Sequence, residues 1–417
     1  MQFSSYGEKY TGDSGIVRLM DDLGRTLQAH PEMLMLGGGA PGRITEVEQV
    51  FQQHLQKIAG NRESLFSLLG RYQEPRGDVA VRETLATMLQ TQYGWAVTAE
   101  HIALTNGGQS AFGILANMYA GTIEDGSKRK LLFPLCPEYL GYADIGAVHD
   151  MFVSNKPALE IGEDGLFKYH VDFAGLQLDD SIGALCVSRP TNPSGNVISD
   201  AEIKQLDQLA ARHGKPLIID AAYGHPFPAI VYNEATAYWS SNVILMLSMS
   251  KLGMPGTRSG ILVAEPSIIE AFSRANTILN LASSNLGSVM LHSLLQSNQL
   301  LPLCKNIIRP WYEQRRNVLL AALQENLRDI PCHIHRAEGA FFLWLWFPDL
   351  PVTDTALYEL LKAAGVLVIP GSSAFIGLQE DWPHSRQCLR LSYGLDEDQL
   401  VKAARIIGRV IKGVRVI

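Results

Sequence analysis

The stretch LSMSKLGMPGTRSG, residues 247–260, ends a short apolar run and opens a turn that contains three glycines. Lys251 comes directly after the apolar run, and Arg258 follows seven positions later. A charged side chain at the end of a buried strand needs an explanation, because removing it from water is costly. Glycines in such a turn let the backbone pass close to a ligand. We therefore treat these two cations as candidate ligand-binding groups.

Similar short apolar runs recur along the first 300 residues, each closed by polar or turn residues. Their length and β-branched content are typical of buried strands in a mainly parallel sheet. Between two of them, residues 199–214 have the capped, amphipathic pattern of a helix. The alternation predicts an α/β fold, a three-layer α/β/α large domain with a mainly parallel mixed sheet. The expected strands lie within 101–108, 130–139, 183–195, 215–224, 242–251 and 259–266.

The pattern changes after about residue 300 and predicts a small α+β domain. We expect the large domain to span residues 45–300, and the small domain to combine residues 1–44 with 301–417. The sequence predicts helices at 311–327, 353–365 and 396–414, the first beginning just past Pro310, and strands at 338–347, 366–371 and 387–394.

Composition and charge exclude several classes of function. The net charge is −7 and no long basic run is present, which argues against nucleic acid and anionic membranes as partners. The KRK stretch at 128–130 is interpreted as a solvated loop. The polar N-terminus has no apolar segment of a secretory signal, and no apolar run reaches the roughly 18 residues of a membrane span.

The cysteines predict a reducing compartment. There are five, scattered and odd in number, which fits free thiols in the cytoplasm and not a disulfide framework. The stretch CHIHR, residues 332–336, is interpreted as an exposed strand with its two histidines on one face and Cys332 on the other. Only two ligands would converge there, so no metal site is expected.

Polar side chains or glycines with accessible backbone N–H groups follow five of the predicted strands. Because the carboxyl ends of parallel strands meet at one edge of a sheet, these groups are expected to share a binding site. They are Asn106, Gly107, Gly108, Gln109, Tyr139, Asn192, Asp220, Tyr223, Ser248, Ser250 and Lys251. Each has an ordinary explanation when taken alone, as a solvated strand end, a turn or a helix cap. Together, in this order, they favour one cofactor, a phosphorylated pyridine aldehyde.

Each part of such a cofactor has a matching group. A lysine amine forms a Schiff base with the aldehyde, and a carboxylate keeps the ring nitrogen protonated. Lys251 and Asp220 suit these two tasks. Asn192 and Tyr223 can donate to the ring phenolate, and Tyr139 offers an aromatic face for stacking. The phosphate would be held by Gly107, Gly108, Gln109, Ser248 and Arg258.

Four stretches resemble the class I/II (fold type I) pyridoxal-phosphate aminotransferases: SMSKLGMPGTRSG, RPTNPSGNVI, IIDAAYG and TNGGQSA. The resemblance runs from LGGGAP (36–41) to QCLRLSYG (387–394). Through LCPEYLGYAD, KYHVDF and FFLWLWF, the chain looks closest to the branch that transfers amino groups between valine and pyruvate.

The resemblance implies further roles. Lys251 is expected to carry the cofactor and shuttle the proton, and Arg390 to grip the substrate carboxylate, with Gly39 adding a backbone donor. Tyr72 in YQEPRG is expected to reach the phosphate of a neighbouring subunit, which implies a homodimer with shared active sites. One departure is visible, because the Lys251–Arg258 spacing is one residue shorter than the commoner family spacing. The loop between them is expected to be tighter.

The resemblance also implies a function. We expect a transaminase that uses pyridoxal 5'-phosphate (PLP) to move an amino group, by a ping-pong mechanism, from an aliphatic amino acid of the valine or alanine type to a 2-oxo acid such as pyruvate. Residues 275–290 contain no evident cation for a second substrate carboxylate. Alternatives are another PLP enzyme of this fold (an alanine, aromatic or kynurenine-type transaminase or a C–S β-lyase) and a non-catalytic regulator. The N-terminal segment through Arg18 is a candidate to close over the site.

Overall fold

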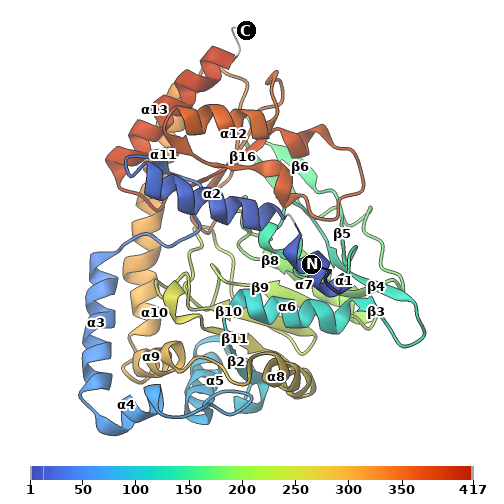
Figure 1. Ribbon diagram of the computed structural model, residues 1–417, viewed down its shortest axis with the longest axis vertical. Coiled ribbons are helices and arrows are strands. Elements are labelled where there is room, and N and C mark those ends of the chain that lie inside the picture. Colours follow the sequence, from blue (N-terminus) through green and yellow to red (C-terminus); the bar gives the residue numbers. More distant parts are fainter. Residues whose placement is uncertain (1, 13, 415–417) are drawn as a thin grey trace.

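Two β-sheets organise the chain in the computed structural model, which describes residues 2–12 and 14–414. The larger sheet has eight strands in the order β2-β11-β10-β9-β8-β4-β3, with β5 paired to β4 (Figure 1). Their bounds are β2 (Ile102–Thr105), β3 (Gly121–Thr122), β4 (Lys128–Phe133), β5 (Phe152–Ser154), β8 (Ile182–Ser188), β9 (Leu217–Asp220), β10 (Val243–Ser248) and β11 (Gly260–Val263).

Most pairs in this sheet are parallel, as the sequence predicted. β5, β4, β8, β9 and β10 run in one direction, whereas β11 is antiparallel to both β10 and β2. Alternate side chains enter cores on opposite faces of the sheet, because successive residues of a strand point to opposite sides. Ile218 packs in the core with α6 (Gly108–Tyr119) and α8 (Pro266–Asn280), while Leu217 and Ile219 pack in the core with α5 (Val79–Tyr93) and α7 (Asp200–Arg212). The three-layer α/β/α prediction is confirmed.

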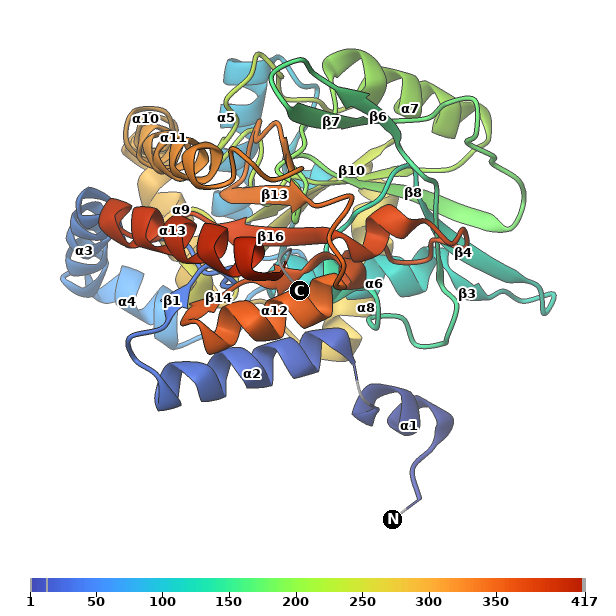
Figure 2. The ribbon, with the colours of Figure 1, turned by 90° about the horizontal axis from the view of Figure 1, so that it is seen from above.

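A second sheet of six strands has the order β15-β16-β13-β12-β7-β6. Its strands are β6 (Ala158–Ile161), β7 (Leu166–His170), β12 (His333–His335), β13 (Phe342–Trp346), β15 (Ile369–Pro370) and β16 (Cys388–Ser392). Helices α11 (Arg309–Asn326), α12 (Asp354–Ala363) and α13 (Glu397–Val414) lie on it (Figure 2). The short strand β1 (Leu34–Met35) pairs in parallel with β14 (Val366–Leu367), which ties the N-terminal segment to the C-terminal part.

The predicted domain bounds stay a prediction, and one pairing bears on them. β7 pairs in parallel with β12, so residues 158–170 add two strands to the second sheet, although they lie inside the predicted large domain. The partners of β7 on β12 are 168 residues away along the chain, so no local pattern indicates this exchange.

The remaining helices surround the larger sheet and its open edge. They are α1 (Ser5–Thr11), α2 (Gly15–Ala29), α3 (Thr45–Ala59), α4 (Arg62–Leu69), α9 (Asn285–Gln296) and α10 (Leu300–Leu303). A π-helical turn (Cys304–Ile308) joins α10 to α11. α11 begins at Arg309, so Pro310 lies in its first turn, where a missing N–H costs nothing, and not before it. Both ribbon views place α2 alongside α12 (Figures 1 and 2).

Two local interpretations are wrong. The KRK stretch is not a loop, since β4 begins at Lys128 and pairs antiparallel with β3 as a hairpin. The CHIHR stretch is not an exposed strand, since β12 lies between β7 and β13 and His335 is 1% exposed. His335 stacks on Tyr169, so burial against aromatic rings and not exposure accounts for this segment. Within the described ranges, no helix is both long and apolar enough to cross a membrane.

Candidate active site

A cavity of about 640 Å³ opens at the carboxyl ends of the parallel strands. It lies where the two sheets meet, since Asp220 ends β9 of the larger sheet and Arg390 lies on β16 of the second. The structure thus brings together most of the residues that the sequence singled out. Those lining the cavity are Gly39, Gly108, Gln109, Tyr139, Asn192, Asp220, Tyr223, Ser248, Ser250, Lys251, Arg258 and Arg390.

Lys251 lies between the strand edge and the N-terminal loop. Its amine donates a hydrogen bond to the carbonyl oxygen of Gly39 at 2.7 Å and lies 5.3 Å from the centre of the Tyr223 ring. Gly39 therefore offers its carbonyl to the lysine here, and the backbone donor that the resemblance implied at Gly39 stays a prediction. Burial, reinforced by the positive charge of Arg390, lowers the pKa of Lys251 to about 8. The neutral form of this amine is therefore populated at lower pH than for an ordinary lysine, although the protonated form still predominates below about pH 8.

The carboxyl of Asp220 is held by two donors. Tyr142 donates a hydrogen bond to Oδ2, and the backbone N–H of Ala222 donates to Oδ1 at 2.8 Å. Burial raises the pKa of Asp220, while these two hydrogen bonds and the nearby Lys251 oppose that shift. The acid is therefore fixed in orientation before any ligand arrives.

Two residues of this region were missed in the sequence. Tyr142 is one, and Glu138 is the other; both are 1% exposed. Glu138 accepts hydrogen bonds from the backbone N–H of Ser188 at 2.8 Å and from its hydroxyl at 2.6 Å, and burial raises the pKa of Glu138 to about 8. Their only signal is proximity in LCPEYLGY to Tyr139, one residue before it and three after.

Arg390 is a buried cation with unfilled hydrogen-bonding capacity. It donates from Nη1 to the side-chain oxygen of Asn192 and from Nη2 to the carbonyl oxygen of Gly37, each at 2.7 Å. Its Nε is buried and has no acceptor among the described residues. No carboxylate neutralises it in the described chain, and burial lowers its pKa to about 10. An incoming carboxylate would supply the missing charge and acceptor.

Arg258 reaches the start of α6 despite the short spacing from Lys251. Gly107, which precedes α6, has a φ of +89°, and a Cβ there would lie 2.8 Å from Nη2 of Arg258. The Arg258 guanidinium therefore packs directly against the glycine at the helix N-terminus, where backbone N–H groups and the helix dipole favour an anion. The side chain of Gln109, which the sequence assigned to the phosphate, donates instead to the carbonyl oxygen of Gly141 at 2.8 Å.

The glycines of the Lys251–Arg258 turn differ in what they do. Gly253 has a φ of +116°, a conformation that side chains oppose. A Cβ at Gly260 would lie 2.7 Å from the hydroxyl of Thr105, so close packing excludes a side chain there. Gly256 faces open space and carries no such requirement. Ser248 accepts a hydrogen bond from the backbone N–H of Ser250 at 3.1 Å, which shapes the start of the turn.

Tyr72 lies away from the cavity. It is 80% exposed and lines a separate surface hollow with α4 and the segment before α9. Its expected contact with a neighbouring subunit stays a prediction.

Helix α2 closes one side of the cavity with apolar side chains. Ile16, Leu19, Met20 and Leu23 all line it. Asp22, on the same helix, bonds with Tyr358 and Lys362 of α12. On the other side, α1 donates from Lys9 and Tyr10 to the carbonyl oxygens of residues 144 and 145. The N-terminal segment thus spans both parts of the molecule across the cavity, and whether it moves stays a prediction.

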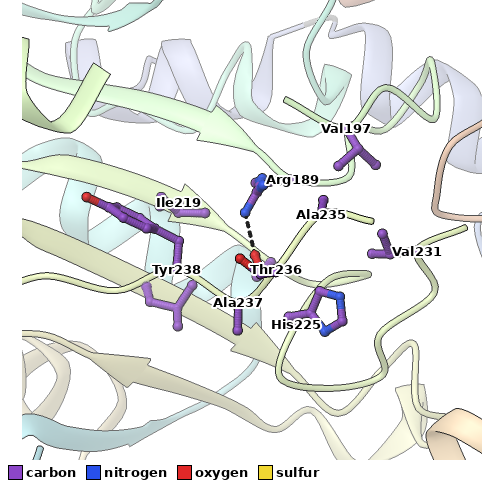
Figure 3. Close-up of a pocket in the computed structure, with 11 residues that line it drawn as sticks. Arg189, Val197, Ile219, His225, Val231, Ala235, Thr236, Ala237 and Tyr238 are labelled. Atoms are coloured by element: carbon purple, nitrogen blue, oxygen red, sulfur yellow. Dashed lines mark hydrogen bonds between the residues drawn. The ribbon is translucent and has the colours of Figure 1, made fainter. Parts of the chain in front are cut away.

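Arg189 anchors the backbone behind the site. It ion-pairs with Asp200 and donates to the carbonyl oxygen of Ile198 at 2.7 Å. It also donates to the carbonyl oxygen of Thr236 at 2.7 Å (Figure 3). The space it borders with His225 is only about 10 Å³, too small for a substrate. These contacts indicate a structural role. Within the described part of the chain, no group of three or more His, Cys, Asp or Glu side chains could hold a metal ion.

Comparison with known proteins identifies the family. The family model for aminotransferase class I and II matches residues 39–407. The chain is a class I/II aminotransferase. It is 45% identical over 412 residues to valine–pyruvate aminotransferase of Escherichia coli (strain K12), covering 99% of this chain and 98% of that protein.

Solved structures agree with this family membership. The valine–pyruvate aminotransferase from Salmonella typhimurium LT2 is 44% identical, with a TM-score of 0.89 over 96% of this chain and 100% of that one. The aspartate aminotransferase from Thermus thermophilus is 21% identical, with a TM-score of 0.78 over 98% of this chain and 100% of that one, and supports the fold alone. The predicted family and fold type are confirmed.

Proposed function

We propose that this aminotransferase uses PLP to move an amino group between an aliphatic amino acid of the valine or alanine type and a 2-oxo acid such as pyruvate. One observation carries the proposal: Lys251, Asp220 and Arg390 face a single cavity, Asp220 from β9 of the larger sheet, Lys251 from the turn after β10, and Arg390 from β16 of the second sheet. The full-length similarity to two proteins named valine–pyruvate aminotransferase supports the choice of substrates.

The residues present fit PLP. The start of α6 with Arg258 packed against Gly107 makes an anion site, and a side chain at that glycine would obstruct it. Asp220 supplies a fixed carboxylate for the ring nitrogen, and Lys251 supplies an amine of lowered pKa. When bound, PLP would provide an aldehyde for amines and a ring that withdraws electrons from the substrate Cα.

The protein's own groups then divide the work. Arg390, which lines the cavity, would grip the substrate carboxylate with the guanidinium N–H groups that Asn192 and Gly37 leave free, which fixes the direction of the Cα–H bond. The Lys251 amine would accept the proton from the substrate Cα, which requires a neutral amine, and would then donate it to the carbon on the other side of the amino nitrogen, a 1,3-transfer. Its lowered pKa makes that form available near neutral pH. The amide oxygen of Asn192 accepts a hydrogen bond from Arg390, which leaves its amide nitrogen as a donor for the cofactor phenolate.

The walls of the cavity support an aliphatic substrate. Its lining includes Ile16, Leu19, Met20 and Leu23 from α2, which offer apolar surface to a side chain. The lysines and arginines that line it in the described chain are Lys251, Arg258 and Arg390, each already assigned. A second substrate carboxylate would have no cation of its own from this subunit, which disfavours dicarboxylic amino acids.

A homodimer is part of the proposal. Large apolar side chains are exposed on α4 and on the segment 278–286, both of which contribute residues to the hollow that Tyr72 lines: Phe66, Leu69, Ile278, Leu279, Leu281 and Leu286. Asn285 at the start of α9 donates to the carbonyl oxygens of Ser67 and Arg71, so α4 and the 278–286 segment are joined in one surface. Such a patch marks an interaction site, and a second copy would place Tyr72 near the partner's cavity. We place the enzyme in the cytoplasm, where the five free cysteines stay reduced.

A donor screen tests this function. The purified protein, supplied with PLP, is given pyruvate and a panel of amino donors, with 2-oxo acid and ammonia both measured. We expect valine to be a good donor, no ammonia release, and no turnover in Lys251→Ala. Ammonia release from cysteine conjugates would identify a β-lyase instead, and turnover confined to aromatic donors or kynurenine would identify another transaminase. A DNA mobility shift without any turnover would identify a regulator.

A further inference from the structure

A buried lysine lies outside the cavity, on β7, in the KYHVDF stretch (168–173) that the proposed function leaves without a role. Lys168 is 7% exposed. Its amine forms a close ion pair with Glu338, and it also donates to the carbonyl oxygen of Val197 at 3.0 Å and to the side-chain oxygen of Asn196 at 3.3 Å. All three of its N–H groups therefore have an acceptor.

Glu338 holds the same loop from the other side. Its carboxylate accepts a hydrogen bond from the backbone N–H of Val197 at 3.2 Å. The N–H groups of Glu338 and Gly339 both donate to the carbonyl oxygen of Gly195 at 3.1 Å. Gly195 has a φ of +71°, and a Cβ there would lie 3.0 Å from the carbonyl oxygen of Gly339. The loop is thus clamped by an ion pair, by backbone hydrogen bonds and by close packing.

The clamped loop carries Asn192. The N–H of Thr191 donates to the carbonyl oxygen of Asn196, and the N–H of Gly195 donates to that of Thr191, each at 2.8 Å, which closes a tight turn around Asn192. The side-chain oxygen of Asn192 accepts from Arg390 at 2.7 Å. A displacement of this loop would therefore move Asn192 and remove one of the two contacts that orient the Arg390 guanidinium.

Stability alone does not explain charges at this place. Burying an ion pair costs about as much desolvation as its attraction returns, and an apolar pair of similar volume is often equally stable. Unlike an apolar pair, the ion pair makes directional hydrogen bonds. The Lys168 ammonium has three acceptors and the Glu338 carboxylate has two donors, so together they restrict the loop to one arrangement. Fixed geometry within a fraction of an ångström is what substrate-orienting groups require.

We propose that Lys168 and Glu338 are positioning residues for the reaction, which hold the Asn192 loop so that Asn192 and Arg390 meet the substrate carboxylate and the cofactor in one geometry. This proposal rests on the proposed function, because the roles of Asn192 and Arg390 come from it. Neither residue is among those that line the cavity, so both would act through the loop.

Three variants and one matched control test the proposal in the PLP-loaded enzyme. Glu338→Gln and Lys168→Met each leave one buried group without its charged partner, whereas Lys168→Met/Glu338→Leu removes both charges. Arg336→Met is the control, since Arg336 pairs with Glu160 next to the same sheet but both side chains are solvent-accessible (35% and 49% exposed). The readouts are KM for valine, kcat, the melting temperature, and the pH midpoint of the cofactor absorbance change.

The expected results separate positioning from folding. Each single variant should raise KM about 10- to 100-fold and shift the pH midpoint, with a lower melting temperature. The double variant should recover part of the lost melting temperature, because no orphan charge remains although the backbone groups of Val197 lose their partners, yet keep the raised KM and the shifted midpoint. The control should match the wild type. Recovery of KM together with the melting temperature, or an unchanged KM and midpoint in the single variants, would overturn the proposal. A wild-type enzyme without transamination or cofactor absorbance would instead overturn the proposed function.

Discussion

The phenol of Tyr142 donates a hydrogen bond to Asp220, which lies 78 residues away along the chain at the end of β9. The Tyr142 ring is itself fixed, since it stacks on Phe112 with their ring centres 3.6 Å apart. The core helix α6 thus holds the tyrosine, the tyrosine holds the carboxylate, and the carboxylate faces the cavity. This chain of contacts makes Asp220 rigid before ligands bind, which suits the role that we propose for it at the ring nitrogen of the cofactor.

The first prediction concerns that contact. Tyr142→Phe removes the hydrogen bond while the ring can still stack on Phe112, and a carboxylate that loses a donor becomes easier to protonate. We expect kcat/KM to fall at least about tenfold, since a hydrogen bond to a charged group contributes about 1.5–3 kcal/mol. Steady-state kinetics and a PLP-binding titration measure it. The control is Tyr119→Phe, because Tyr119 lies on α6, the helix that carries Phe112, but does not line the cavity. Equal kinetics in the two variants would contradict the prediction.

The second prediction concerns Arg390. Arg390→Lys keeps the charge but loses the planar fork that bonds Asn192 and Gly37 and leaves Nε for the substrate. We expect KM for valine to rise about 100-fold, because altering one partner of a buried, hydrogen-bonded charge pair typically weakens binding by about this factor or more. The cofactor absorbance should remain, because Lys251 and the anion site are intact. An unchanged KM would remove Arg390 from substrate binding, and Arg386→Lys, an exposed pair with Asp381, provides the comparison.

The third prediction concerns the wall formed by α2. Leu23 lines the cavity, whereas Val17 lies on the same helix, 51% exposed and outside the lining. Leu23→Ala should reduce the preference for valine over alanine about tenfold, because a few apolar carbons change such a ratio by 10- to 200-fold. Val17→Ala should leave the ratio unchanged. Competition between the two donors gives the ratio directly, and the same value in both variants would show that α2 does not select the side chain.

The fourth prediction concerns the amine of Lys251. Its pKa is lowered from 10.5 to about 8 by burial and then by Arg390, so the reactive neutral form appears at lower pH than for an ordinary lysine. In cofactor-free protein, the rate of Lys251 acylation should rise as the pH increases through about 8 and then level off. Arg390→Met removes a nearby positive charge, so the midpoint should move to higher pH. Peptide mass analysis locates the modified lysine, and a midpoint near 10.5 in the wild type would refute the shift.

The sequence by itself determined the sheet at the centre of the molecule and the groups along its edge. Continuous apolar runs such as residues 217–219 and 243–247 are buried on both faces, so local hydrophobicity specifies them. Because parallel strands end at one edge, the residues that follow them meet in space. Lys251, Asp220 and Asn192 therefore line one cavity, as the order of their strands indicated.

Only the tertiary structure decided what holds those groups. The Tyr142–Asp220 bond, the burial of Glu138 and the addition of β6 and β7 to the second sheet join residues far apart in the chain. The Lys168–Glu338 pair spans 170 residues, and neither member stands out from an ordinary surface charge in the sequence. Hydrophobic periodicity records which face of an element is buried, but not which element it meets. Long-range pairing, and the hydrogen bonds that orient a site, are fixed only when the packed sheets bring those elements together.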